Sequence, residues 1–273
     1  MKKTIFLLAA ICTTALFYVS CSSNDDGGIT NTIDVSAIGA SITIDATNEM
    51  DLNTGLLVAT SSTTAKTAET PAGICAAITV SGTTYPKTIT VDYGTTGCTD
   101  NQITRKGKLK VTLTGPVTTT GSKMTIERID YFINSLKLDG TIEYTNTTTV
   151  ATVPQWSRKV SNGKLTDPLG NIFTNSGMYT TKQTAGVDTP LVLADNVYEI
   201  TEGSHMVTAP NGASLTLTVK ETLIKKYSCT FISKGQLKVE GSILNGVIDY
   251  GNNDCDSKYT FTTESGASYN LIM

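Results

Sequence analysis

The sequence predicts an all-β fold, an antiparallel meander of about a dozen strands that forms a sandwich or a curled open barrel, with a short N-terminal helix. Three observations support this prediction. Apolar and polar residues alternate along most of the chain after residue 74, turn signals separate the alternating segments, and an Asp-Tyr-Gly motif followed by a cysteine occurs twice. Together they indicate strands that pair with their neighbours in sequence.

The alternation identifies the strands. Leu109, Val111 and Leu113 share one face of a strand, and the same pattern recurs within residues 88–93, 136–144, 215–220 and 259–271. One-sided alternation is typical of antiparallel strands with one face in solvent. Between Ile126 and Tyr131 the pattern slips by one residue, which predicts a β-bulge.

Turn residues and a weak helical spacing complete the predicted elements. Residues 167–171 (Asp-Pro-Leu-Gly-Asn) and 210–212 (Pro-Asn-Gly) predict turns between strands. Gly107 precedes a Lys-Leu-Lys-Val segment, which predicts a strand leaving a tight turn. Apolar residues within 48–59 are spaced for a short helix, and residues 60–71, rich in Ser, Thr and Ala, predict a loop.

The N-terminus has the features of a bacterial lipoprotein signal. Two lysines precede an apolar run that is too short to span a membrane, and the run ends at Ser20-Cys21. We therefore expect residues 1–20 to be a signal peptide and Cys21 to be acylated, which anchors the protein in the membrane through its acyl chains. Ordinary secretion is the alternative. Residues 21–33 are a flexible tether, and residues 34–273 form a single β-rich domain.

Four cysteines remain after Cys12 is removed with the signal and Cys21 is acylated. An even number of cysteines in an oxidising compartment favours disulfides. Three pairings are possible. We predict Cys75 with Cys98 and Cys229 with Cys255, because the two loops have similar lengths and each encloses an Asp-Tyr-Gly motif, at residues 92–94 and 249–251. The strand pattern places both tyrosines in the core and both aspartates outside.

These motifs carry a resemblance. Residues 88–94, then Cys98, then residues 104–108, with a second Asp-Tyr-Gly and a cysteine before the C-terminal strand, resemble a group of uncharacterised surface lipoproteins of the Bacteroidota. The Ser-rich and then acidic order of residues 22–26 also resembles the export signal of such lipoproteins. The resemblance implies an all-β fold and an outer-membrane location at the cell surface. It implies no activity and no catalytic residues.

Few residues are candidates for a site. Trp156, the only tryptophan, is the predicted ligand-binding residue, because its ring can stack on a sugar; packing on the core is the alternative. His205 is the only histidine and is predicted to be an exposed strand residue. Residues 249–256 contain several oxygen-bearing side chains suited to calcium, but a structural role explains both Asp-Tyr-Gly copies. We therefore predict no catalytic residue, no metal site and no cofactor.

A basic strip follows the first cysteine pair. Lys106, Lys108 and Lys110 alternate onto one face of a strand, where we expect them to lie at a solvated sheet edge that discourages strand pairing. Contact with an anionic glycan is the alternative. The chain as a whole has a formal net charge of -3, so nucleic acid is excluded as a partner.

The sequence thus predicts a non-enzymatic, lipid-anchored protein of the outer membrane that is exposed at the cell surface. Its expected role is that of a binding module for a glycan, a protein or another extracellular ligand. A structural or adhesive component of the envelope is the alternative function, and a hydrolase is the least favoured.

Overall fold

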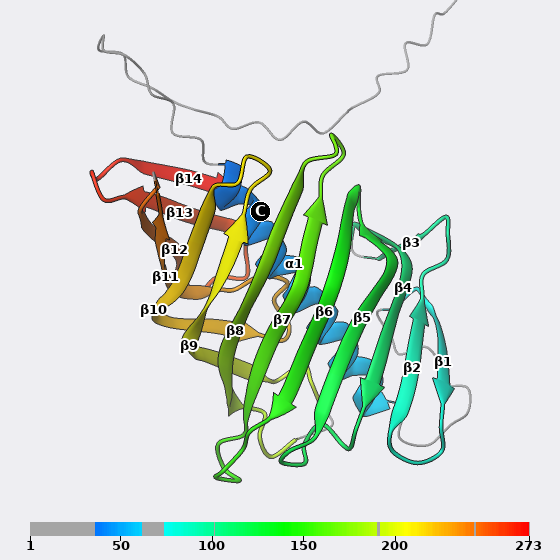
Figure 1. Cartoon of the computed structure of the whole chain (residues 1–273). Coiled ribbons are helices and arrows are strands. Elements are labelled where there is room, and N and C mark those ends of the chain that lie inside the picture. The colour runs from blue at the N-terminus through cyan, green and yellow to red at the C-terminus, as the bar shows by residue number, and fades with distance from the viewer. Residues whose placement is uncertain (1–35, 62–73, 101, 190–191, 243, 273) are drawn as a thin grey trace, which may run out of the picture. The chain divides into compact units, whose positions relative to one another are not determined.

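The alternating segments form one antiparallel sheet of 14 strands in the computed structural model, which describes residues 36–61, 74–100, 102–189, 192–242 and 244–272 (Figure 1). The chain divides into Met1–Thr32 and a unit from Ile33 to Met273, and every described residue belongs to the second. The predicted signal peptide, Cys21 and the whole predicted tether, together with residues 62–71 of the predicted loop, lie outside the described residues.

One helix and 14 strands make up the described part of the chain. In chain order their bounds are α1 Ser36–Ser61, β1 Ala77–Ser81, β2 Lys87–Asp92, β3 Cys98–Asp100, β4 Ile103–Leu113, β5 Lys123–Ile133, β6 Leu136–Asn146, β7 Gln155–Thr166, β8 Ile172–Ala185, β9 Val197–Thr208, β10 Ser214–Lys226, β11 Lys234–Gly241, β12 Gly246–Asn252, β13 Lys258–Thr263 and β14 Ser268–Ile272.

The topology is the predicted meander. Each strand pairs with the next along the chain, except that β3 and β2 both pair with β4. Within the described residues β1 and β14 each have one strand partner, so the sheet is open. The all-β antiparallel fold class is confirmed, and of its two forms the structure has the curled open sheet. The predicted turns at 167–171 and 210–212 join β7 to β8 and β9 to β10.

Bulges interrupt the long strands from β4 to β11. The predicted slip in β5 is confirmed, because its pairing with β6 shifts register between Glu127 and Tyr131. Similar shifts occur between β4 and β5, β6 and β7, and β7 and β8. Gly107 has a positive φ and lies at such a register shift inside β4. The prediction that it marks a tight turn at the start of a strand is therefore wrong. Bulges bend the strands that contain them, and here they curve the sheet.

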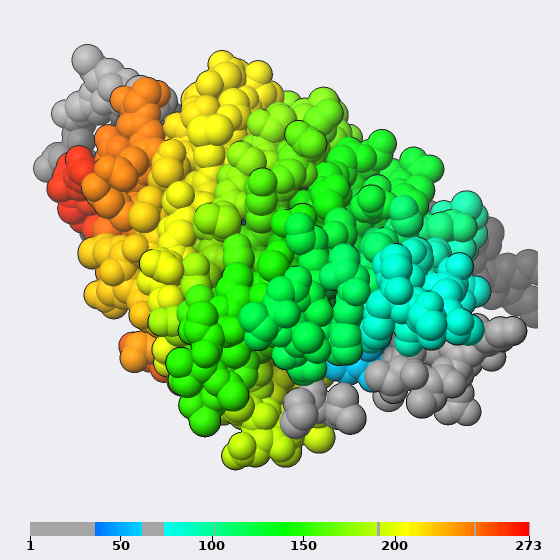
Figure 2. Space-filling view, turned by 60° about the horizontal axis from the view of Figure 1, so that its bottom comes forward, coloured from blue at the N-terminus to red at the C-terminus, as the bar shows by residue number. Residues whose placement is uncertain are grey.

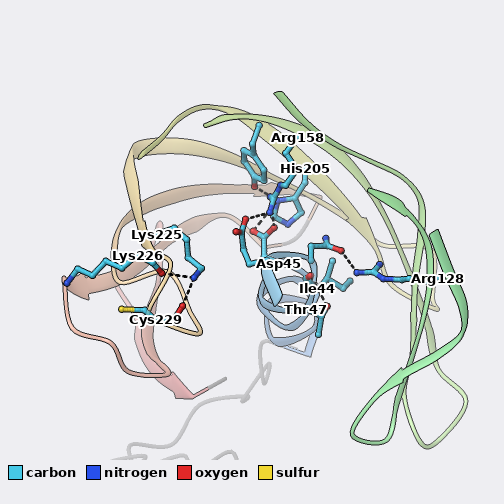
Figure 3. Close-up of polar contacts among 12 residues, drawn as sticks. Ile44, Asp45, Thr47, Arg128, Arg158, His205, Lys225, Lys226 and Cys229 are labelled. Carbon is cyan, nitrogen blue, oxygen red and sulfur yellow. Dashed lines mark hydrogen bonds and ion pairs between the residues drawn. The ribbon is translucent and has the colours of Figure 1, made fainter. Parts of the chain in front are cut away.

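The curved sheet encloses α1, as a view along the helix shows (Figure 3). Ile38, Ile42, Leu52 and Leu56 of the helix join the inward side chains of the sheet in one apolar core. The helix begins well before residue 48 and is longer than predicted. Its apolar residues show no single face because it is buried on most sides, and a one-sided helical pattern arises only when one face meets solvent.

The outer face of the sheet is continuous across the strands from β2 to β10 in the space-filling view (Figure 2). Lys106, Lys108 and Lys110 lie on this face, as predicted, where Lys108 pairs with Asp92 and Lys110 with Glu127. The prediction of a sheet edge is wrong, however. The strand β4 has partners on both sides, because the chain supplies further strands before and after it.

Candidate functional site

Both predicted disulfides are confirmed: Cys75 is joined to Cys98, and Cys229 to Cys255. The aspartates of the two motifs share one backbone function. Asp92 Oδ1 accepts a hydrogen bond of 2.9 Å from the amide of Gly94, and Asp249 Oδ1 accepts one of 2.7 Å from Gly251. Both glycines have positive φ angles, so the two motifs share a local backbone conformation, although β2 ends at Asp92 and β12 continues to Asn252. In the described part of the chain, His, Cys, Asp and Glu form no group of three suited to a metal ion.

Both motif tyrosines are buried, as predicted. Their hydroxyl groups have different surroundings, however. Tyr93 Oη accepts a hydrogen bond of 3.0 Å from Arg105 Nη1. Tyr250 Oη is buried without a hydrogen-bond partner among the described residues. Burial raises the pKa of Tyr250 well above its usual range, and the nearby charge of Asp45 adds to this.

A cavity of about 240 Å³ lies where both disulfide units meet the C-terminal half of α1. We call it the disulfide cavity, because one cysteine of each pair lines it. Its lining is mixed, with apolar side chains, hydroxyl groups, one amide and one charge of each sign. The residues are Met50, Asn53, Thr54 and Leu57 of α1; Ile74, Cys75, Tyr93, Asp100, Ile103 and Arg105 around the first disulfide; and Tyr227, Ser228, Cys229 and Thr230 beside the second.

Arg105 is the cation of this cavity. Its Nη1 donates to Thr54 Oγ1 at 2.7 Å and to Tyr93 Oη, which fixes the side chain against the helix. Burial disfavours its charge, but the neighbouring Tyr131 and Tyr93 more than offset this and hold the pKa of Arg105 above its ordinary value. Its Nε and Nη2 make no hydrogen bond with the described residues. The guanidinium is therefore charged, held in place and only partly satisfied.

Two further arginines connect the helix to the sheet, away from the cavity (Figure 3). Arg128 of β5 lies 2.7 Å from Asp51 Oδ2 and donates to Asn48 Oδ1 at 2.9 Å. Arg158 of β7 donates to Glu49 Oε1, and its Nη2 lies 3.3 Å from Asp45 Oδ1. The helix thus presents acids to a sheet interior that supplies the cations, and removal of either partner would leave a buried charge.

His205 lies in this buried cluster, so the prediction of an exposed residue is wrong. It is 6% exposed, its Nδ1 shares a hydrogen bond with the Tyr179 hydroxyl, and it lies 3.7 Å from Asp45 Oδ2. Burial lowers the pKa of His205, so the ring is neutral near pH 7. The residues next to His205 in sequence include Gly203 and Ser204, which are typical of an exposed segment, but Val207, two residues on, is fully buried. Because residues two positions apart on a strand share a face, the apolar Val207 predicts that His205 also lies on the inner face of the sheet.

Lys225 of β10 is the remaining buried cation of Figure 3. Its Nζ donates to the carbonyl oxygen of Lys226 at 2.8 Å and to that of Cys229. Burial lowers the pKa of Lys225, which the charge of Glu49 partly offsets. The ammonium group therefore holds the backbone of the second disulfide unit at the border of the cavity.

Trp156 lies in the core and not on a surface. It is 6% exposed, stacks on Tyr144 with ring centroids 5.6 Å apart, and contacts Tyr198 edge-on. Its indole nitrogen donates to the carbonyl oxygen of Val117 at 3.1 Å. These contacts favour the core-packing alternative, and the ligand-binding role of Trp156 stays a prediction.

Sequence reasoning found the disulfides but not the cavity between them. Arg105 directly precedes the three lysines of the basic strip, and its alternation against Lys106 places it on the inner face. Among the described residues, no helix combines the length and apolar character that crossing a membrane requires. Comparisons with protein-family models, with curated proteins and with solved structures found no match.

Proposed function

We propose that the protein is a lipid-anchored binding module of the cell envelope that holds a small extracellular ligand in the disulfide cavity. Acyl chains on Cys21 would tether it to the outer membrane, and residues 21–33 would let the β-rich domain stand away from the bilayer. No catalytic step is assigned to the protein.

The observation that supports this proposal most strongly is the fixed but unsatisfied guanidinium of Arg105 in the cavity. Thr54 and Tyr93 hold one of its nitrogens, and the other two have no partner among the described residues. Polar groups that are held in place before binding reduce the entropy lost when a ligand binds. The two disulfides support the cavity in the same way, because they fix the chain on either side of it.

The size of the cavity limits the ligand. Its volume of about 240 Å³ is below the roughly 300–1,000 Å³ of typical small-molecule sites. It therefore suits one small molecule, or the end group of a larger one. The glycan form of the proposal has lost its original basis, because Trp156 is buried and has no exposed ring on which a sugar could stack.

Methionine methyl signals in NMR spectra test the proposal. Met50 lines the cavity, and Met178 is 55% exposed elsewhere. Full-length protein labelled at the methionine methyl groups would be mixed with separate pools of neutral sugars, uronic acids, amino acids and dipeptides. We expect at least one pool to shift the Met50 signal and to leave Met178 unchanged.

A Thr230→Trp variant, which places a bulky ring at the cavity, should lose that shift. A shift that persists in this variant, or the absence of a Met50 shift with every pool, would contradict the proposal. Self-association in sedimentation experiments without any Met50 shift would favour the alternative of a structural or adhesive component. That alternative has one observation in its favour, because the outermost strands β1 and β14 contain no charged residue.

A further inference from the structure

The disulfide cavity contains a second charged residue, Asp100, close to Arg105. The two lie on neighbouring strands, because β3 pairs with β4 and Cys98 is opposite Arg105 while Asp100 is opposite Ile103. Both side chains line the cavity. Diagonal neighbours of this kind are separated by about 7–8 Å between Cα atoms. The pairing of β3 with β4 therefore places Asp100 and Arg105 on the same face of the sheet, and the cavity contains one carboxylate and one guanidinium.

These opposite charges do not neutralise each other. Arg105 and Asp100 form no ion pair, and the carboxylate of Asp100 makes no hydrogen bond with any described residue. Elsewhere the same sheet does pair its diagonal or opposite charges, as Lys108 does with Asp92 at 2.8 Å. An unpaired anion beside a partly satisfied cation, in a cavity of this size, indicates that both charges are available to a ligand.

We infer that the disulfide cavity binds a small zwitterion, namely an α-amino acid with an apolar side chain. The ligand carboxylate would lie on the free Nε and Nη2 of Arg105, which match a carboxylate in a bidentate pair. The ligand ammonium would lie on Asp100. The apolar side chain would pack on Met50, Leu57 and Ile103, which also line the cavity. This inference rests on the proposed binding function and specifies its ligand.

Other ligand classes fit the two charges less well. A simple anion would satisfy Arg105 but would face the carboxylate of Asp100, and a simple cation would face the guanidinium. A neutral sugar can offer hydroxyl groups to both residues, but it supplies no opposite charge to either, and hydrogen bonds between two ionised partners are roughly twice as strong as those between neutral ones. An amino acid with a hydrogen bond of about 2.8 Å at each end spans about 8 Å between the two protein atoms that it contacts. Asp100 and Arg105 line the same cavity from adjacent strands, so an amino acid is the smallest ligand that offers an opposite charge to each.

Calorimetric titration of the full-length protein with L-leucine tests the inference. Two analogues isolate the two charges: 4-methylpentanoate lacks the ammonium group, and 3-methylbutylamine lacks the carboxylate. We expect L-leucine to bind and each analogue to bind at least about tenfold more weakly. Asp100→Asn and Arg105→Gln should each weaken L-leucine binding by at least about tenfold, whereas Lys108→Gln, on the outer face of β4, should leave it unchanged.

Several outcomes would overturn the inference. Equal binding of 4-methylpentanoate and L-leucine would show that the site takes a simple anion, and unchanged binding in Asp100→Asn would remove the role of that residue. If a sugar pool shifts Met50 and L-leucine does not bind, the zwitterion is wrong while the binding function stands. If no pool shifts the Met50 signal, both the zwitterion inference and the proposed binding function are wrong. Asp100 is only partly buried, so its variant remains informative even if Arg105→Gln does not fold.

Discussion

The two disulfide units are alike in their backbones and unlike in their surroundings. In each, an aspartate accepts a hydrogen bond from a glycine two residues later, and a buried tyrosine lies between them. The hydroxyl of Tyr93 contacts Arg105 at the cavity. The hydroxyl of Tyr250 has no hydrogen-bond partner among the described residues and lies within the field of Asp45 and Arg158.

This difference separates the structural role of the motif from any role in binding. The repeated residues form the same aspartate-to-glycine hydrogen bond twice, and neither motif is a site by itself. The chemistry of each unit comes from residues outside the motif, namely Arg105 and Asp100 beside the first unit and the buried cluster of Asp45 and Arg158 near the second. The following three predictions test whether the two regions differ in this way.

The largest contrast is expected between the two arginines. Arg158→Met should lower the free energy of unfolding by about 3–5 kcal/mol, because Arg158 is 2% exposed and its loss leaves Asp45 and Glu49 buried without a cation. Arg105→Met should cost only about 1 kcal/mol, because its partners Thr54 and Tyr93 line a cavity that water can enter.

Urea unfolding curves of the two variants and the wild type measure this difference. Similar losses for both variants would show that Arg105 is as deeply integrated as Arg158, and would weaken the distinction between cavity and core. If Arg158→Met does not accumulate, Arg158→Lys keeps a cation at the site and still reports the greater sensitivity of the buried cluster.

The next largest effect is expected in the pH dependence of stability, to which His205 of the buried cluster contributes. Burial lowers the pKa of His205 below its ordinary value of 6.5, so the unfolded chain takes up this proton at a higher pH than the folded protein does. The contribution of neutral His205 to the free energy of unfolding is fully present above about pH 6.5. It is lost as the pH falls through the lowered pKa of the folded protein. The slope reaches at most about 1.4 kcal/mol per pH unit.

Unfolding free energies at pH 7, 6 and 5, compared between the wild type and His205→Gln, test this prediction. The wild type should lose more stability over this range than the variant, because His205 is the only histidine in the chain. Carboxyl groups that do not contact His205 contribute equally to both pH profiles, so their contribution cancels in the comparison. Parallel pH profiles would mean that the histidine stays solvated in the folded protein.

The smallest contrast concerns the tyrosines themselves. Tyr93→Phe should lower stability by about 1 kcal/mol, because Arg105 loses a hydrogen bond. Tyr250→Phe should change stability by less than about 0.5 kcal/mol, because the hydroxyl it removes has no partner to lose. Thermal unfolding of the two variants under identical conditions gives the order, and a larger loss in Tyr250→Phe would reverse our assignment of the two environments.

Local sequence patterns predicted most of the sheet. Alternation at Leu109, Val111 and Leu113 predicted strand β4, and the slip before Tyr131 predicted its neighbour's bulge. The buried charges escaped prediction because their partners are distant in sequence. Arg158 and Glu49, for example, are 109 residues apart. A charged residue in an alternating strand is ordinarily assigned to the solvent face, and only a partner from another segment makes the inner face acceptable.

The sequence by itself determined the antiparallel meander, the two disulfide pairs and the positive-φ glycine of each Asp-Tyr-Gly motif, because these depend on alternation, spacing and local backbone chemistry. The tertiary structure alone decided that α1 fills the curve of the sheet, that His205 is buried, and that Arg105 and Asp100 share a cavity between the two disulfides. Those features depend on surfaces that meet only when the bulged sheet curves around the helix, and no local pattern specifies such a contact.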